Sequence, residues 1–321
     1  MSDTHNRLIE ENVRERRFQA DQNFEGWRLD EYLANRIGGM SPELATRVAD
    51  EGDVVVDGSS DVGADTMIDD GTVVVVREHL EPEYVQDGDV ETLYEDEAVL
   101  VLDKPPGMLI HETASVRLNT ITHYLHRRGL DGAEPAHRLD ADTSGALVCA
   151  RCHDQVAALR GLFKEGDPTK VYRVLVVDPE QRWETGTETT LDTPLGIDDE
   201  SRLPHRMGRG EQRAVTHVEV LGRQAHPMGE LADLKVAIET GRQHQIRVHL
   251  ALEDTPVAGD KMYGRSDQFF IDLCDRPEDD ELLSALHFER HALHARRIEL
   301  SHPVDDRRLL VEAPLPDLWE Q

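Results

Sequence analysis

The stretch that decides the fold is residues 137–151, His-Arg-Leu-Asp-Ala-Asp-Thr-Ser-Gly-Ala-Leu-Val-Cys-Ala-Arg. Residues 143–145 have the composition of a turn, and the apolar run from Ala146 to Ala150 predicts a short buried strand. Asp140 would therefore lie at the mouth of a strand, where a carboxylate is well placed to act on a bound molecule. The alternative is a surface turn whose two aspartates cap their own backbone, and these residues alone do not decide between the two.

A second polar segment follows two predicted strands, 214–221 and 231–238. It runs over residues 239–250 as Glu-Thr-Gly-Arg-Gln-His-Gln-Ile-Arg-Val-His-Leu. If this segment is helical from about Gln243, its spacing places His244 and Arg247 on one face of the helix. The two segments together offer a carboxylate, an imidazole and a guanidinium for one site.

Three separated strings in this chain resemble the motifs of one known family. His-Arg-Leu-Asp-x-x-Thr-Ser-Gly at 137–145 closely resembles the active-site motif of the RluA-type pseudouridine synthases. Residues 240–249 resemble the family's Thr-Gly-Arg-x-His-Gln-Ile-Arg-x-His motif, and Lys-Pro-Pro-Gly at 104–107, after a predicted strand at 99–102, resembles its first motif. The resemblance implies an α+β fold with a mixed, mostly antiparallel sheet and an RNA cleft across its middle. It also implies that the protein converts uridine in rRNA or tRNA to pseudouridine.

The same resemblance implies roles for individual residues. Asp140 would be the essential catalytic residue, and Arg247 would pair with it. Tyr172, at the start of a predicted strand over 170–177, would stack on the target base, although without the resemblance it reads as an ordinary strand aromatic. Arg138 would fill the position that the extruded uridine vacates, and Ile246 would cover the uracil opposite Tyr172.

Further RNA contacts are expected from basic residues near these motifs. In the catalytic domain they are Arg242 and His244. In the N-terminal region they are Arg28 and Arg47. A segment from 183 to 212 without clear periodicity is expected to be a mobile loop or hairpin whose arginines contact phosphates. These arginines are Arg202, Arg206, Arg209 and, just beyond, Arg213.

The implied reaction needs neither a metal nor a cofactor. It breaks the glycosidic bond, turns the uracil and rejoins it through carbon, with no redox change. It does need an ionised carboxylate, and a neighbouring arginine would keep Asp140 charged. Cys149-Ala-Arg-Cys152-His153 matches a haem-attachment string, but the chain has no export signal and Cys149 lies inside an apolar run. A zinc set of Cys274 with His287, His291 and His294 is rejected because 290–295 resembles the family's closing strand.

The N-terminal region resembles a small S-four-like RNA-binding module of α/β type. Two helices are expected, one over 27–37 that ends at Gly38-Gly39 and one from Pro42 to about Glu51, followed by strands at 54–56 and 73–76. Acidic residues surround the arginines of these helices. The alternative is therefore a module that no longer binds RNA and only packs on the catalytic domain.

The expected domain organisation has four parts. Residues 1–16 form a polar tail, 17–80 the RNA-binding module, 81–90 a linker and 91–321 the pseudouridine synthase catalytic domain. Residues 272–281 within the last part are acidic and are expected to form a surface insertion.

The net charge of −30 over 321 residues would ordinarily argue against an RNA partner. Lysine occurs at only five positions, so arginine supplies nearly all the positive charge. Such a composition is typical of a salt-saturated cytoplasm, and a halophilic archaeon is the expected source. No apolar run approaches the ~20 residues that span a bilayer, and no signal peptide is evident, so we expect a cytoplasmic monomer. A non-catalytic RNA-binding protein on the same frame is the alternative function.

Overall fold

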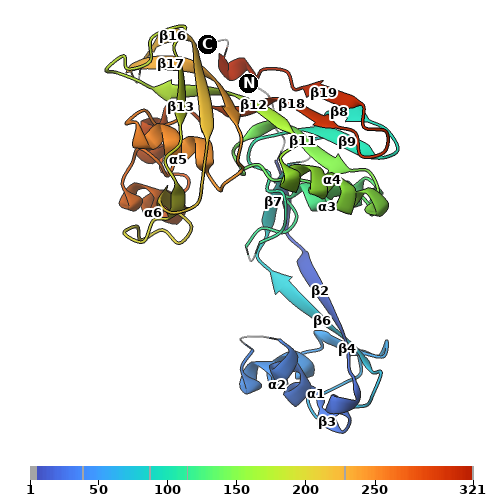
Figure 1. Cartoon of the computed structure of the whole chain (residues 1–321). Helices are drawn as coiled ribbons and strands as arrows, with labels where there is room; N and C mark the ends of the chain where they lie inside the picture. The colour runs from blue at the N-terminus through green and yellow to red at the C-terminus, as the bar shows by residue number, and fades with distance from the viewer. Residues whose placement is uncertain (1–5, 38–39, 87, 114, 228, 320–321) are drawn as a thin grey trace. The chain divides into compact units, whose positions relative to one another are not determined.

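The computed structural model describes residues 6–37, 40–86, 88–113, 115–227 and 229–319. The chain divides into two compact units, Met1–Asp87 and Gly88–Gln321 (Figure 1). The predicted α+β class with a mostly antiparallel sheet is confirmed. No helix in the described part of the chain is both long enough and apolar enough to cross a membrane.

The N-terminal unit packs two helices against a three-stranded antiparallel sheet. The sheet order is β2 (Asn12–Gln19), β6 (Val73–Leu80) and β4 (Val54–Val56). A short strand pair joins β3 (Trp27–Arg28) to β5 (Met67–Ile68), and η1 covers Gln22–Phe24. The helices are α1 (Leu29–Arg36) and α2 (Pro42–Asp50), and they bury Leu29, Tyr32, Leu33 and Ala45 in a common core.

Residues 6–19 form two strands rather than the expected polar tail. β1 (Asn6–Ile9) pairs with β7 (Glu83–Gln86), so the expected linker over 81–90 also contains a strand. β2 pairs along its full length with β6. Backbone hydrogen bonds to a distant strand hold these segments, and their charged side chains leave no apolar alternation that would predict them. Residues 1–5 of the expected tail and Gly38-Gly39 lie outside the described residues.

The second unit is built on a ten-stranded sheet. Its main path has the order β13-β16-β17-β12-β18-β11-β9-β8, while β10 pairs with β11 and β19 with β18. The strands are β8 (Thr92–Glu95), β9 (Val99–Lys104), β10 (Glu134–Pro135), β11 (Ser144–Ala150), β12 (Thr169–Val177), β13 (Glu188–Leu191), β16 (Thr216–His226), β17 (Gly229–Ile238), β18 (Leu293–Ser301) and β19 (Arg308–Glu312). Among the described strands of this sheet, β11 and β18 form the one parallel pair.

Helices cover parts of this sheet. α4 (His153–Glu165) packs against β11, and α5 (Gln245–Leu252) packs against β16 (Figure 1). α3 (Ile121–Arg127) starts at Thr120, whose hydroxyl accepts a hydrogen bond from the backbone of His123. Residues 272–281, expected to form an acidic surface insertion, span the end of α6 (Asp267–Asp275) and the start of α7 (Asp280–Leu286), and the short helix η2 (Asp317–Trp319) follows later.

The segment from 183 to 212 contains β13 and then a separate hairpin. The hairpin pairs β14 (Leu195–Ile197) with β15 (Met207–Arg209). Of the four arginines expected to contact phosphates, three contact other side chains of the protein. Arg206 bonds Asp267 at 2.6 Å, Arg202 bonds Gln268 at 3.0 Å, and Arg213 bonds Glu239 at 2.6 Å.

The turn that carries Asp140 is attached to β18 and to the residues just before it. Gly145 has φ +108°, and a Cβ at this position would lie 2.3 Å from the carbonyl oxygen of Ala295. Only glycine allows β11 to approach β18 this closely. Two hydrogen bonds reinforce the contact, Thr143 Oγ1 with His291 Nε2 at 2.8 Å and Ser144 Oγ with His294 Nδ1 at 2.9 Å.

Candidate active site

A cleft in the second unit has Asp140 at its centre. Two adjoining cavities, of about 660 and about 550 Å³, share residues 137–140 together with His244 and Arg247 in their walls. Both volumes fall in the range of pockets that bind small molecules or single nucleotides. The first two motifs found in the sequence therefore meet in one place.

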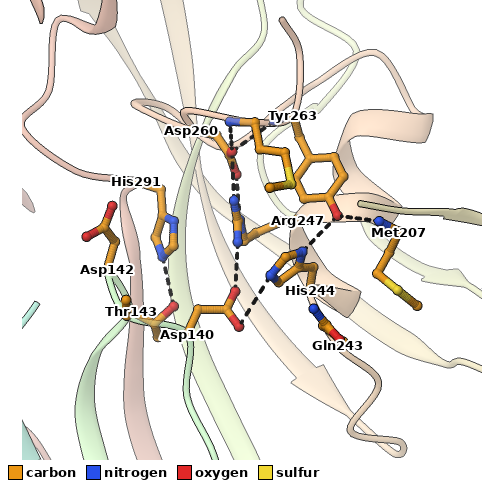
Figure 2. Close-up of polar contacts among 12 residues, drawn as sticks. Asp140, Asp142, Thr143, Met207, Gln243, His244, Arg247, Asp260, Tyr263 and His291 are labelled. Carbon is orange, nitrogen blue, oxygen red and sulfur yellow. Dashed lines mark hydrogen bonds and ion pairs between the residues drawn. The ribbon is translucent and has the colours of Figure 1, made fainter. Parts of the chain in front are cut away.

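Asp140 forms an ion pair with Arg247, as the sequence resemblance implied. Arg247 Nη1 donates to Asp140 Oδ2 at 2.9 Å (Figure 2). The Arg247 side chain is 8% exposed and that of Asp140 is 19% exposed, so the carboxylate still reaches the cleft. Arg247 lies in the first turn of α5, which places its side chain toward the turn that holds Asp140.

A second carboxylate, which the sequence analysis did not assign to the site, holds Arg247 from the other side. Asp260 accepts from Arg247 Nε at 2.6 Å and from Nη2 at 2.9 Å, and its side chain is fully buried. Asp260 Oδ1 also accepts from the backbone N–H groups of Met262 and Tyr263. Although burial opposes charge, Arg247 lowers the pKa of Asp260 to about 2. The bidentate contact therefore fixes the guanidinium so that Nη1 donates to Asp140.

The electrostatics of the site keep Asp140 ionised. Burial is the largest single contribution and raises the pKa of this carboxyl, but the charge of Arg247, the hydrogen bond that Arg247 donates and smaller contributions from neighbouring groups together outweigh it. The net pKa of Asp140 lies below its ordinary value. At neutral pH the cleft therefore presents a charged carboxylate, the form that can act as a nucleophile or base.

His244 faces the other oxygen of Asp140. Its Nε2 lies 4.0 Å from Asp140 Oδ1, and its Nδ1 lies 2.9 Å from the hydroxyl of Tyr263 (Figure 2). That hydroxyl accepts a hydrogen bond from the backbone N–H of Met207 in β15 at 3.0 Å. His244 precedes α5 with φ +55°, a left-handed conformation that is uncommon for residues other than glycine. His244 was predicted to contact RNA, and the structure places it beside the carboxylate.

Tyr172 and Ile246 line the smaller cavity beside Asp140. They come from β12 and α5, and they are 7% and 5% exposed. Burial raises the pKa of Tyr172, so its hydroxyl stays protonated and the side chain is uncharged. Both residues therefore line the same cavity as Asp140, and their contact with a uracil ring stays a prediction.

Arg138 lies on the rim of both cavities and is exposed to solvent. Among the residues that the structure describes, no carboxylate forms an ion pair with it. Arg242 is different, because its Nε donates to the carbonyl oxygen of Arg213 at 3.0 Å and its backbone N–H donates to Gln245. The Arg138 cation is thus available to a ligand, whereas one donor of the Arg242 side chain already bonds the protein backbone.

The two arginines predicted to bind RNA in the N-terminal unit lie beside acidic side chains. Arg28 donates two hydrogen bonds to Asp30, at 3.1 and 3.0 Å. Arg47 lies 3.9 Å from Glu51, and both of these side chains are mostly exposed. These pairs reduce the positive charge that the module presents.

A buried lysine connects the Lys-Pro motif to the Asp140 turn. Lys104 Nζ donates to the carbonyl oxygens of Pro105, Met108 and Ala141 at 2.7 to 2.8 Å. Because the side chain is completely buried, its pKa falls to about 7. The sequence string indicated this motif but gave no signal for its contact with residue 141.

The cysteines and histidines that resembled metal or haem ligands have other partners or surroundings. Cys149 is buried, and burial raises the pKa of its thiol to about 12. His291 and His294 bond the Thr143 and Ser144 hydroxyls, as described above. Within the described ranges, no group of three or more His, Cys, Asp or Glu side chains is arranged to hold a metal ion.

Comparisons with known proteins agree with this geometry. Residues 98–252 match the sequence profile of a family described as RNA pseudouridylate synthase. The chain is 32% identical over 303 residues to ribosomal large subunit pseudouridine synthase D of Xanthomonas campestris, covering 91% of this chain and 86% of that protein. It is also 32% identical to the protein of the same name from Pseudomonas aeruginosa, over 92% of this chain and 91% of the relative.

A solved structure shares the fold. Human RNA pseudouridylate synthase domain containing 1 aligns with a TM-score of 0.55 at 24% identity, over 71% of this chain and 84% of the other. The extent of the sequence matches, over nearly the full length of both partners, exceeds what a shared fold alone requires. The chain therefore belongs to the RluA-type family of RNA pseudouridine synthases.

Proposed function

We propose that this enzyme isomerises specific uridines in the RNA of the large ribosomal subunit, with Asp140 as the reacting carboxylate. The observation that carries the proposal is the position of Asp140 in the cleft wall, with Oδ2 held by Arg247 and Oδ1 4.0 Å from Nε2 of His244. The names of the bacterial relatives support ribosomal RNA as the substrate. Transfer RNA is the alternative.

The described residues suit each requirement of the reaction. Extruding a uridine from folded RNA costs a few kcal/mol, and the uncompensated cation of Arg138 would occupy the vacated place. Tyr172 and Ile246 would hold the extruded uracil from two sides. The C1′–N1 bond breaks, a C1′–C5 bond forms, and the proton of C5 moves to N1, so no further reactant is needed. Asp140 acts as nucleophile or base in this exchange.

We also propose that the N-terminal unit is an S-four-like module that assists RNA binding in a cytoplasmic monomer. Its two helices on a small antiparallel sheet support this assignment. Because Arg28 and Arg47 have acidic neighbours, the module would contribute less affinity than a strongly basic one. Most of the binding free energy would then come from the cleft.

Mapping pseudouridine in unmodified transcripts tests the substrate. Large-subunit rRNA, small-subunit rRNA and tRNA transcripts of the host would be incubated with the protein in concentrated potassium chloride, then mapped by carbodiimide modification and primer extension. We expect a new pseudouridine at one or a few positions of large-subunit rRNA with the wild-type protein and none with Asp140→Ala. A site that appears only in tRNA would replace the proposed substrate. Formation of the same product by the wild-type protein and by Asp140→Ala would contradict the role of Asp140.

We propose a halophilic source from the charge balance, and low salt tests it. With a net charge of −30, repulsion between carboxylates is screened only at high ionic strength. Dialysis from concentrated potassium chloride into 0.1 M salt, where the screening length grows to about 10 Å, is expected to unfold the protein. Circular dichroism and the midpoint of thermal unfolding would measure this. An unchanged midpoint at low salt would refute the proposed adaptation.

A further inference from the structure

The two carboxylate oxygens of Asp140 have different surroundings. Oδ2 accepts from Arg247, whereas Oδ1 lies 4.0 Å from Nε2 of His244 (Figure 2). A separation of 4.0 Å is too long for a hydrogen bond between these two atoms. The side chains of Asp140 and His244 are 19% and 13% exposed, and both line the two cavities of the cleft. A polar pair in the cleft wall is therefore open to a ligand.

Tyr263 determines which nitrogen of His244 carries the proton. Its hydroxyl oxygen accepts from the backbone N–H of Met207, and among the described residues the acceptor within reach of its own proton is His244 Nδ1, at 2.9 Å. Because Nδ1 accepts this hydrogen bond, the proton of a neutral imidazole lies on Nε2. Burial is the largest contribution that lowers the pKa of His244, and the ring is neutral at pH 7. The cleft thus presents an N–H donor beside a carboxylate acceptor.

Only certain chemical groups satisfy such a pair together. A single atom about 2.8 Å from both Nε2 and Oδ1 has to accept one hydrogen bond and donate another. The carbonyl groups of uracil only accept, and its N3–H only donates. Within an RNA chain the 3′ and 5′ oxygens of a nucleotide are esterified, so the 2′-hydroxyl is the one group of a uridine that does both.

We propose that His244 Nε2 and Asp140 Oδ1 together bind the 2′-hydroxyl of the target ribose, and that Tyr263 positions His244 for this contact. The inference rests on the proposed function, since it concerns the same cleft. Binding at C2′ places the adjoining C1′, where the glycosidic bond breaks, next to Asp140. It also lets the enzyme distinguish RNA from DNA at the reacting nucleotide.

A comparison of two substrates by two enzymes tests the proposal. The substrates are RNA fragments containing the mapped uridine, one entirely ribose and one with 2′-deoxyuridine at that position. We expect the deoxy substitution to slow the wild-type single-turnover reaction about 10- to 100-fold, as loss of a hydrogen bond to a charged group does. In His244→Phe the all-ribose reaction is slower, and the ratio of the rate on all-ribose RNA to the rate on the deoxy substrate falls about tenfold. Tyr263→Phe is expected to give an intermediate ratio.

The ratio makes the test independent of folding, because a partly folded variant loses activity on both substrates equally. His153→Phe, a change at an exposed histidine outside the cleft, is expected to keep the wild-type ratio. A 2′-deoxy nucleotide on the 3′ side of the target should affect wild type and His244→Phe alike. If the ratio of the two rates is the same in wild type and His244→Phe, the inference is overturned while the proposed function stands. Absence of product from all-ribose RNA overturns the proposed function and the inference with it.

Discussion

Replacing Asp140 with asparagine is expected to lower the single-turnover rate of pseudouridine formation by about 10⁴-fold or more, as removal of a reacting side chain does in other enzymes. Asparagine has the same shape, and its carbonyl oxygen can still accept the 2.9 Å hydrogen bond from Arg247 Nη1. It lacks the negative charge that makes the residue a nucleophile or base. RNA affinity should therefore change little while the chemical step is lost.

Rapid-quench experiments with enzyme in excess over RNA would measure this single-turnover rate. Filter binding in concentrated potassium chloride would measure the affinity for RNA. Asp154→Asn is a matched control, because this aspartate lies in the first turn of α4 and is exposed. It should react at the wild-type rate. A rate for Asp140→Asn within tenfold of wild type would falsify its assignment as the reacting carboxylate.

Replacing Asp260 with leucine is expected to destabilise the second unit by about 3–5 kcal/mol, because it removes one partner of a buried ion pair. Arg247 would keep its charge with only Asp140 to balance it, and Nε and Nη2 would lose their acceptors. The backbone N–H groups of Met262 and Tyr263 would lose theirs as well. Urea denaturation at high salt, followed by circular dichroism, gives the free energy of unfolding.

Asp89→Leu provides the control for this change. Asp89 pairs with Arg128 at the surface, where the two side chains are 84% and 50% exposed, and its loss should cost no more than about 1 kcal/mol. Asp260→Asn keeps the shape and should cost less stability than leucine. Its activity should still fall, since Arg247 would then be free to turn both donors toward Asp140. Equal stabilities of Asp260→Leu and Asp89→Leu would argue against an essential buried ion pair.

The central ion pair could be predicted from sequence because both partners belong to ordered strings. Asp140 lies in one motif and Arg247 in another. Because both motifs resemble those of one family, their pairing could be predicted from the sequence. The strands around them, such as β11 and β12, also have continuous apolar runs that predict burial. The local sequence pattern was sufficient to predict an element wherever that element depends mainly on its own residues.

Asp260 and Tyr263 were not predicted as site residues because their roles depend on partners elsewhere in the chain. Nothing in the string Gly-Asp-Lys-Met-Tyr indicates that the carboxylate of Asp260 accepts hydrogen bonds from the guanidinium of Arg247, 13 positions earlier. Met207, which helps to fix Tyr263, comes from a hairpin in a segment without periodicity. β2 was missed for the same physical reason, since cross-strand backbone bonds leave little trace in side-chain order.

The contact between β11 and β18 has a consequence for how the enzyme becomes active during its synthesis. Ser144 and Gly145 pair with His294 and Ala295, some 150 positions later, and side-chain hydrogen bonds span the same interval. Closing so long a loop is slow compared with local folding, and it must wait until the distant residues exist. A nascent chain on the ribosome that ends before residue 291 holds both motifs but not the strand that orders the Asp140 turn. Catalytic competence therefore has to wait until residues 291–295 have been synthesised and have left the ribosome.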